Sequence, residues 1–224
     1  DVCQSTGGFT DCLLQQGAAR VVGIDVGHGQ LHSSLRAHAQ VVCIEGVNAR
    51  SLTVEDFWRH HDEAAGEASG ARPPFELLTG DLSFISLTLV LPAMVPLLKL
   101  GGDALMLVKP QFELQPGQVG KGGIVKDPAL FARVEQRLRT CCEELGLEVL
   151  AWLDSPIEGG DGNREFFIHA RKMRDLKPSL ADAPARQVAK RQARGERKKL
   201  SDEDERQAAH DGQPGPARRK RKAD

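Results

Sequence analysis

The sequence contains no tyrosine, and its other aromatic residues are few and unevenly placed. All eight Phe and both Trp lie before Arg171, so residues 176–224 contain none. That segment has only three Leu and one Val as sizeable aliphatic residues, which is too little apolar surface for a hydrophobic core. We therefore expect one folded domain at residues 1–175 and a disordered tail at residues 176–224.

Cysteine is also scarce, and no hydrophobic run is long. The five Cys residues form no Cys-x-x-Cys pair, which argues against a disulfide framework or a zinc site and indicates a reduced, cytoplasmic protein. The longest apolar run, residues 85–98, contains two Pro and is shorter than the roughly 20 residues of a membrane span. His60 and His61 are adjacent and have no partner at ligand spacing. The sequence thus predicts neither a membrane segment nor a metal site.

Charge divides at the same place as the aromatic residues. Residues 1–175 carry 16 Lys and Arg against 23 Asp and Glu, a net charge of −7, whereas residues 176–224 carry 14 against 8, a net charge of +6. This division excludes a uniformly basic nucleic-acid-binding protein. The basic cluster Arg218–Lys222 fits a solvated tail, a weak contact with RNA phosphates or a nuclear address.

Short β-branched runs alternate with helix-like segments, which is typical of an α/β protein with a mostly parallel sheet. The expected strands are residues 20–25, 40–45, 75–81, 103–109, 148–153 and 165–170. The expected helices are residues 10–16, 30–38, 53–61, 86–99 and 128–145, the last with Asp127 as N-cap and Pro128 at its first position. The first four strands end in a charged residue, and ligands of open α/β sheets bind beyond the carboxyl ends of the strands.

The first ten residues read as the end of a strand and a small-residue turn into a helix. Gly7 and Gly8 allow close approach of a ligand, and Asp1 suits a cofactor with a positive or hydrogen-bond-donating group. Asp25, at the end of the next strand, suits a ribose diol. Within residues 1–50, Gly-x-Gly occurs only at residues 27–29, after the second strand, which disfavours NAD binding. Residues 117–123 lack the Ser or Thr of a phosphate-binding loop.

Four further strings follow the Ser-Thr-Gly-Gly-Phe turn in order: Asp81–Leu87 (DLSFISL), Leu107–Glu113 (LVKPQFE), Val119–Gly123 (VGKGG) and Gly162–Phe166 (GNREF). With them the sequence resembles the hemolysin A (TlyA) family of FtsJ-like RNA methyltransferases, from Asp1 to about Arg171. The resemblance implies a Rossmann-like S-adenosylmethionine-dependent methyltransferase fold, with a seven-stranded sheet whose last strand is antiparallel and with helices on both faces. It also implies methyl transfer to a ribose 2'-hydroxyl of ribosomal RNA, free or within a ribosomal subunit.

The resemblance further implies a catalytic set in the order Lys-Asp-Lys-Glu, of which Asp81, Lys109 and Glu165 match the last three. A ribose hydroxyl is a poor nucleophile near neutral pH, and lysine is a base whose pKa falls readily on desolvation. Lys109 is thus the candidate base, Asp81 the residue that aligns it, and Glu165 a hydrogen-bonding partner. The implied cofactor-binding residues are Asp1, Gly7, Gly8, Phe9, Asp25, Asn48 and Asp81.

The sequence departs from the family at its beginning. Cys3 stands where the family usually has glycine, and Gly46-Val47 replaces a polar pair before Asn48. The family's first catalytic lysine and its RNA-binding module would both precede Asp1, so we expect the chain to be part of a longer protein. The alternatives are a catalytically impaired RNA-associated protein of the same fold and a membrane-damaging hemolysin.

Overall fold

A computed structural model of the chain describes residues 1–66, 72–160 and 162–175. The chain divides into two units, Asp1–Ala185 and Arg186–Asp224, and the second lies entirely outside the described residues. The predicted disordered tail and its cluster Arg218–Lys222 lie outside them as well. The description below concerns the first unit.

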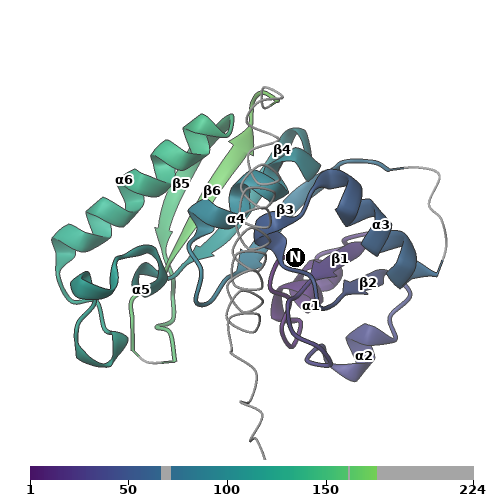
Figure 1. The fold of residues 1–224 in the computed structure, drawn as a ribbon, viewed down its shortest axis with the longest axis horizontal. Helices are drawn as coiled ribbons and strands as arrows, with labels where there is room; N and C mark the ends of the chain where they lie inside the picture. The colour runs from purple at the N-terminus through teal and green to yellow at the C-terminus, as the bar shows by residue number, and fades with distance from the viewer. Residues whose placement is uncertain (67–71, 161, 176–224) are drawn as a thin grey trace, which may run out of the picture. The chain divides into compact units, whose positions relative to one another are not determined.

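The first unit alternates strands and helices along the chain, as Figure 1 shows. In order, the helices and strands are α1 (Gly8–Gln15), β1 (Val21–Ile24), α2 (Ser33–Arg36), β2 (Val41–Ile44), α3 (Val54–Ala65), β3 (Phe75–Asp81), α4 (Leu87–Met94), β4 (Leu98–Val108), α5 (Pro110–Glu113), α6 (Pro128–Glu144), β5 (Leu147–Asp154) and β6 (Phe166–Lys172).

Six strands form the sheet, in two groups joined by a single residue. β1 pairs with β2, and the other group runs in the order β3-β4-β6-β5. Val2 lies between the groups and bridges Ile24 of β1 and Gly80 of β3, in parallel with both. Within the described residues, the sheet thus consists of six strands and the bridging residue Val2, and the predicted count of seven strands is not confirmed. The pairs β1–β2 and β3–β4 are parallel, whereas β6 is antiparallel to both of its neighbours, so the last strand runs as predicted.

Helices cover both faces of the sheet. Phe166 and Phe167 are consecutive in β6, so their side chains point to opposite faces. The ring of Phe166 contacts Phe131 of α6 with 5.5 Å between centroids, and the ring of Phe167 contacts Phe9 of α1 at 6.4 Å. α1 and α6 therefore lie on opposite faces, and the predicted α/β layering is confirmed.

Helix ends differ most from the sequence prediction. The helix expected at residues 86–99 ends at Met94, because a 3₁₀ turn with Pro96 follows and Leu98 already pairs with Phe75 in the sheet. The helix expected at residues 30–38 is only the single turn α2. The start of α6 is as predicted, since Asp127 Oδ1 accepts a hydrogen bond from Ala129 N at 2.9 Å.

Candidate active site

Three of the predicted site residues meet at the carboxyl end of the parallel strands. Asp81 is the last residue of β3, Lys109 directly follows β4, and Glu165 directly precedes β6. The strand registers pair Asp81 with Leu107 and Val108 with Phe166. Because Lys109 and Glu165 each lie one residue beyond the last pair, the sheet itself brings the three side chains to one edge.

Lys109 and Asp81 form an ion pair at this edge. Lys109 Nζ lies 2.5 Å from Asp81 Oδ1 and donates a hydrogen bond to Ser83 Oγ at 3.1 Å. The Lys109 side chain is 15% exposed and that of Asp81 is 43% exposed, so the amine is largely covered while the carboxylate still faces solvent. A lysine held in this way has a defined direction, which is the requirement for a positioned base.

Glu165 is buried beside this pair. Burial raises the pKa of its carboxyl group, the positive charge of Lys109 lowers it, and the negative charge of Asp81 raises it again. The backbone passes close by, since a Cβ at Gly159 would lie 2.4 Å from Glu165 Oε1. Glu165 therefore acts on both members of the pair through its charge.

A buried asparagine, which sequence reasoning did not single out, holds the glycine-rich loop against this edge. Asn163 accepts a hydrogen bond from Val125 N at 2.9 Å and donates one to Gly123 O at 3.0 Å. The string at residues 162–166 thus contains Asn163, which holds the loop, and Glu165, which is a predicted site residue. Two predicted motifs far apart in sequence meet here.

The turn after Val2 has the openness expected of a ligand-binding turn. Gly7 precedes α1 with φ +101°, and a Cβ there would lie 2.4 Å from Leu35 Cδ1. A Cβ at Gly8, in contrast, would meet nothing within 4 Å. Gly7 is therefore required by packing, whereas Gly8 faces open space where a ligand has room.

Asp1 belongs to a row of side chains behind the same turn. Thr10 Oγ1 donates a hydrogen bond to Asp1 Oδ2 at 2.8 Å and accepts one from Gln4 Nε2 at 2.8 Å. Gln4 occupies space left by Gly23, where a Cβ would lie 2.0 Å from the Gln4 side chain. The row holds the Asp1 carboxylate in place at the start of the turn.

Of the remaining predicted cofactor residues, Asp25 and Asn48 follow β1 and β2, and Phe9 lies in α1. Asp25 accepts hydrogen bonds from Ser5 N and Gly27 N, both at 2.8 Å, so its carboxylate is oriented by the turns around it. Asn48 is exposed and accepts a hydrogen bond from Arg50 N at 3.0 Å, which caps a short 3₁₀ turn. Phe9 packs against Phe167, as described above.

Cys3 directly follows Val2 in the turn before α1. Its backbone is in the left-handed region, with φ +60°. Its N–H donates to Ile24 O at 2.8 Å. Burial and the charges of Asp25 and Asp81 raise the pKa of its thiol to about 11, against the opposing charge of Lys109. The position where the family usually has glycine thus has a backbone conformation that favours glycine.

Comparisons with known proteins show the family of the chain. The family model described as FtsJ-like methyltransferase matches residues 1–172. The chain belongs to this family. It is 44% identical over 192 residues to the 16S/23S rRNA (cytidine-2'-O)-methyltransferase TlyA of Mycobacterium tuberculosis, a match that covers 84% of this chain and 66% of that protein. The chain thus spans just under two thirds of this relative's length.

Two solved structures are similar to the chain in fold. A putative hemolysin from Streptococcus thermophilus superimposes with a TM-score of 0.69 at 34% identity, covering 88% of this chain and 68% of that one. A putative S-adenosylmethionine-dependent methyltransferase from Listeria monocytogenes has a TM-score of 0.54 at 13% identity, covering 78% and 90%. The predicted fold class is therefore confirmed.

Two aromatic residues of this FtsJ-like domain were missed in the sequence. Phe84 is 91% exposed and has φ +63°, and its ring lies 4.9 Å from that of Phe112. Phe84 stands three residues after Asp81, and Phe112 three residues after Lys109. This equal spacing within the two motif strings is the signal that was available in the sequence.

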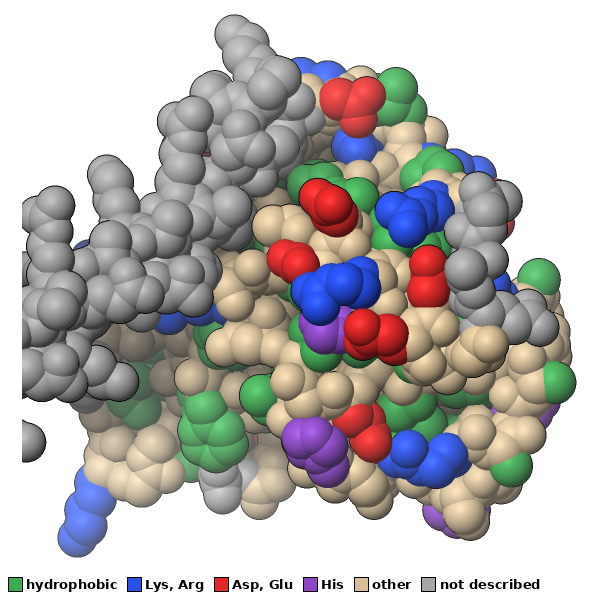
Figure 2. Space-filling model, turned by 45° about the vertical axis from the view of Figure 1, so that its right-hand side comes forward, with side chains coloured by type: hydrophobic (Ala, Val, Ile, Leu, Met, Phe, Trp, Pro, Cys, Tyr) green, Lys and Arg blue, Asp and Glu red, His purple; other side chains and the backbone are tan. Residues whose placement is uncertain are grey.

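The surface of the domain is mixed in charge where it can be seen. On the face shown in Figure 2, Lys and Arg side chains are interspersed with Asp and Glu, and the coloured residues form no broad basic patch. Within residues 1–66, 72–160 and 162–175, no helix is long and apolar enough to cross a membrane. The same residues contain no group of His, Cys, Asp and Glu that could hold a metal ion.

Proposed function

We propose that this chain is the catalytic domain of an S-adenosylmethionine-dependent methyltransferase that methylates a ribose 2'-hydroxyl of ribosomal RNA. The observation that carries the proposal is the Lys109–Asp81 ion pair beside the buried Glu165, at the edge of the sheet where α/β proteins bind ligands. The name and 44% identity of the mycobacterial relative support ribosomal RNA as the substrate. Because ribosomes lie in the cytoplasm, we propose that the protein acts there.

The residues around the first turn fit the cofactor. Gly8 leaves open space above the turn, and Asp25 presents an oriented carboxylate that suits the ribose diol. Asp1 would face the amino group of the methionine part, and Asn48 would lie near the adenine. S-adenosylmethionine supplies a methyl group already activated by a positive sulfur, so the protein has only to align the acceptor.

Lys109 would accept the proton of the 2'-hydroxyl as the ribose oxygen forms its bond to the methyl carbon and the bond from that carbon to sulfur breaks. The amine must be neutral to take the proton, and Asp81 and Ser83 fix the direction of its Nζ atom. Glu165 is buried beside the Lys109–Asp81 pair, and the positive charge of Lys109 lowers the pKa of its carboxyl group against the effect of burial.

Phe84 and Phe112 provide a surface for the nucleobase of the target nucleotide. A nucleobase that has left its RNA helix can stack on an exposed aromatic ring near Lys109. The ribose attached to that nucleobase would then reach the lysine amine. With a net charge of −7, residues 1–175 supply little attraction for RNA. We propose that most of the long-range attraction for RNA comes from outside residues 1–175.

Calorimetry with S-adenosylmethionine separates this function from its alternative, an RNA-associated protein without catalysis. The alternative is favoured by Cys3, whose side chain stands at the turn that would hold the cofactor. Micromolar binding supports the enzyme, and no binding up to millimolar concentration supports the alternative. The full-length protein should then transfer a labelled methyl group to ribosomal RNA at a 2'-oxygen, which nuclease mapping identifies. Transfer to a base would contradict the proposed acceptor.

A further inference from the structure

The loops that carry Asp81 and Lys109 are tied together by one buried carboxylate. Glu113, at the end of α5, is 3% exposed. Its Oε2 accepts a hydrogen bond from Ser86 Oγ at 2.5 Å, and its Oε1 accepts one from Leu87 N at 2.7 Å. Ser86 and Leu87 end the loop that begins at Asp81, and Glu113 ends the turn that begins at Lys109. The two loops are thus closed against each other.

The tie is short and continues into α6. Only three residues separate Lys109 from Glu113, and they include Pro110, whose φ is fixed by its ring. Arg137 of α6 donates hydrogen bonds to Glu113 O at 2.5 Å and to Thr88 Oγ1 at 3.1 Å, so it joins α6 to the turn after Lys109 and to the first turn of α4. A movement of Glu113 is therefore transmitted directly to Lys109.

The carboxylate is held where a charge is costly. Burial raises the pKa of Glu113, and the hydrogen bonds from Ser86 and Leu87 and the charge of Arg137 oppose that shift. The Leu87 N–H belongs to the first turn of α4, where the helix dipole favours a negative group. Both oxygens of this buried carboxylate accept hydrogen bonds from one neighbouring loop. Because an apolar residue would fill the same space at a lower desolvation cost, we assign the carboxylate a role in positioning that loop.

We infer that Glu113 is a positioning residue, which keeps the Lys109 amine on Asp81 by locking the two loops together. The inference rests on the proposed function in so far as Lys109 is the base. Glu113 itself lies behind the ion pair and contacts no reacting atom. Its loss is expected to lower kcat, since a small displacement of a base is costly, and to leave the KM for S-adenosylmethionine unchanged.

The test follows the reactivity of Lys109 and needs no methylation. The full 224-residue chain is treated with acetic anhydride, and acetylation of Lys109 is measured by peptide mass spectrometry relative to Lys99. Lys99 is a suitable internal reference because it forms an exposed ion pair with Glu76, away from the tie. In Glu113→Ala the ratio is expected to rise about tenfold, since two hydrogen bonds to a charged acceptor are lost.

Two variants separate positioning from general destabilisation. Glu113→Gln keeps an acceptor for Leu87 N and offers an N–H to Ser86 Oγ, so its ratio is expected to stay within about twofold of the parent. Leu138→Val removes buried volume from α6 but leaves the hydrogen-bonding groups of Glu113, Ser86 and Arg137 in place, and it should lower the melting temperature without raising the ratio. If Glu113→Ala does not fold, Ser86→Ala removes one of the two bonds and should give an intermediate rise.

An unchanged ratio in Glu113→Ala, or in Ser86→Ala when that variant replaces it, would overturn the inference. So would an equal rise in Leu138→Val, because that result would trace the reactivity to global loosening. Methylation by the parental enzyme is measured separately. If the parent fails to methylate RNA while the acetylation ratios behave as expected, the proposed function fails and the positioning of Lys109 by Glu113 stands.

Discussion

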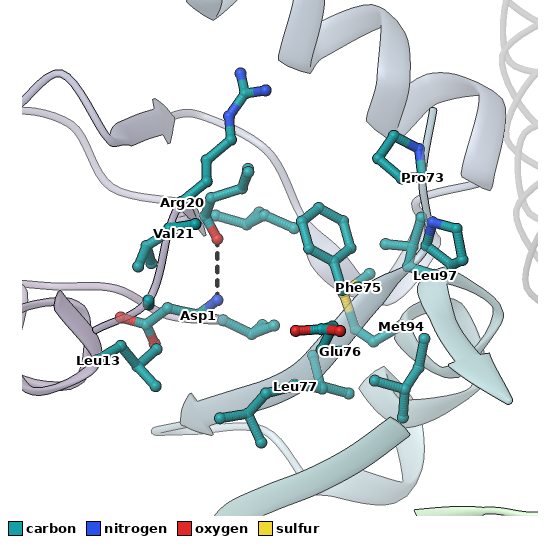
Figure 3. Close-up of a pocket in the computed structure, with 18 of the residues that line it drawn as sticks. Asp1, Leu13, Arg20, Val21, Pro73, Phe75, Glu76, Leu77, Met94 and Leu97 are labelled. Atoms are coloured by element: carbon teal, nitrogen blue, oxygen red, sulfur yellow. Dashed lines mark hydrogen bonds between the residues drawn. The ribbon is translucent and has the colours of Figure 1, made fainter. Parts of the chain in front are cut away.

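The two ends of the strands in this sheet differ in chemistry. At the carboxyl end, charged side chains from three strands meet around Lys109. Near the amino end, the described residues line a cavity of about 620 Å³. Figure 3 shows its lining, with side chains such as Val21, Phe75 and Met94. The cavity and the charged cluster around Lys109 thus lie at opposite ends of the strands, although Asp1, a predicted cofactor-binding residue, also lines the cavity.

The cavity is lined mainly by apolar side chains from several helices and strands. Phe57 and Trp58 of α3 pack there against Phe75, whose ring is stacked on Trp58 with 5.9 Å between centroids. His61 is buried beside them, with Nδ1 3.1 Å from Asp62 Oδ1. The comparison shows that the candidate site is identified by charged side chains that converge, and less by the volume of a cavity. The predictions below test this division.

The largest effect is expected for Lys109→Ala at the carboxyl end. Removal of the base should slow methyl transfer by a full-length, competent form about 10³-fold, with S-adenosylmethionine affinity unchanged. Single-turnover kinetics on ribosomal RNA measure the rate, and Lys99→Ala serves as the control. A parental rate in Lys109→Ala would contradict the mechanism.

At the amino end, Trp58→Ala should act on stability alone. Loss of a buried Trp is expected to lower the free energy of unfolding by about 3–5 kcal/mol, as measured by urea denaturation. Cofactor affinity, measured by calorimetry at a temperature where the variant is folded, should stay unchanged. Lost affinity with unchanged stability would instead indicate that the cavity holds the cofactor.

The paired glycines should separate packing from binding within one turn. Gly7→Ala should destabilise the fold by about 1–3 kcal/mol, because its φ is positive and its Cβ would overlap Leu35. Gly8→Ala should leave the melting temperature unchanged and weaken S-adenosylmethionine binding, because its methyl group would occupy the open space above the turn. Equal behaviour of the two variants would refute the assignment of that space to the cofactor.

Phe84→Ala should affect RNA and not the cofactor. Stacking of one base on an aromatic ring accounts for a rise of about tenfold in the KM for RNA. Met173→Ala, which removes another exposed apolar side chain at the end of β6 away from the site, is the matched control. An unchanged KM in Phe84→Ala would exclude the stacking role.

The smallest effect is expected for Cys3→Gly. Glycine adopts the left-handed conformation of this position without strain and removes a side chain beside the proposed cofactor, so S-adenosylmethionine affinity should rise by about threefold. Cys12→Ala, at an exposed cysteine of α1, should leave affinity unchanged. A fall in affinity for Cys3→Gly would show that the thiol contributes to binding.

Much of the fold could be predicted because its signals are local. The β-branched runs and the charged residues that end them identify β1 to β4, and Asp127 with Pro128 identifies the start of α6. The end of α4 could not be predicted in the same way. Val95 to Lys99 continues an apolar pattern that suits a helix or a strand, and only the pairing of Leu98 with Phe75 decides between them.

The same distinction between local signals and tertiary structure applies to the candidate site. The sequence by itself determined which residues carry charge at strand ends, and the motif strings identified Asp81, Lys109 and Glu165. Tertiary structure alone decided the register of β6 against β4, which sets Glu165 next to Lys109, and decided that Glu113 closes the two loops. The physical reason is that periodicity and turn chemistry act between near neighbours in the chain. A register between strands more than 50 residues apart depends instead on how the whole core closes.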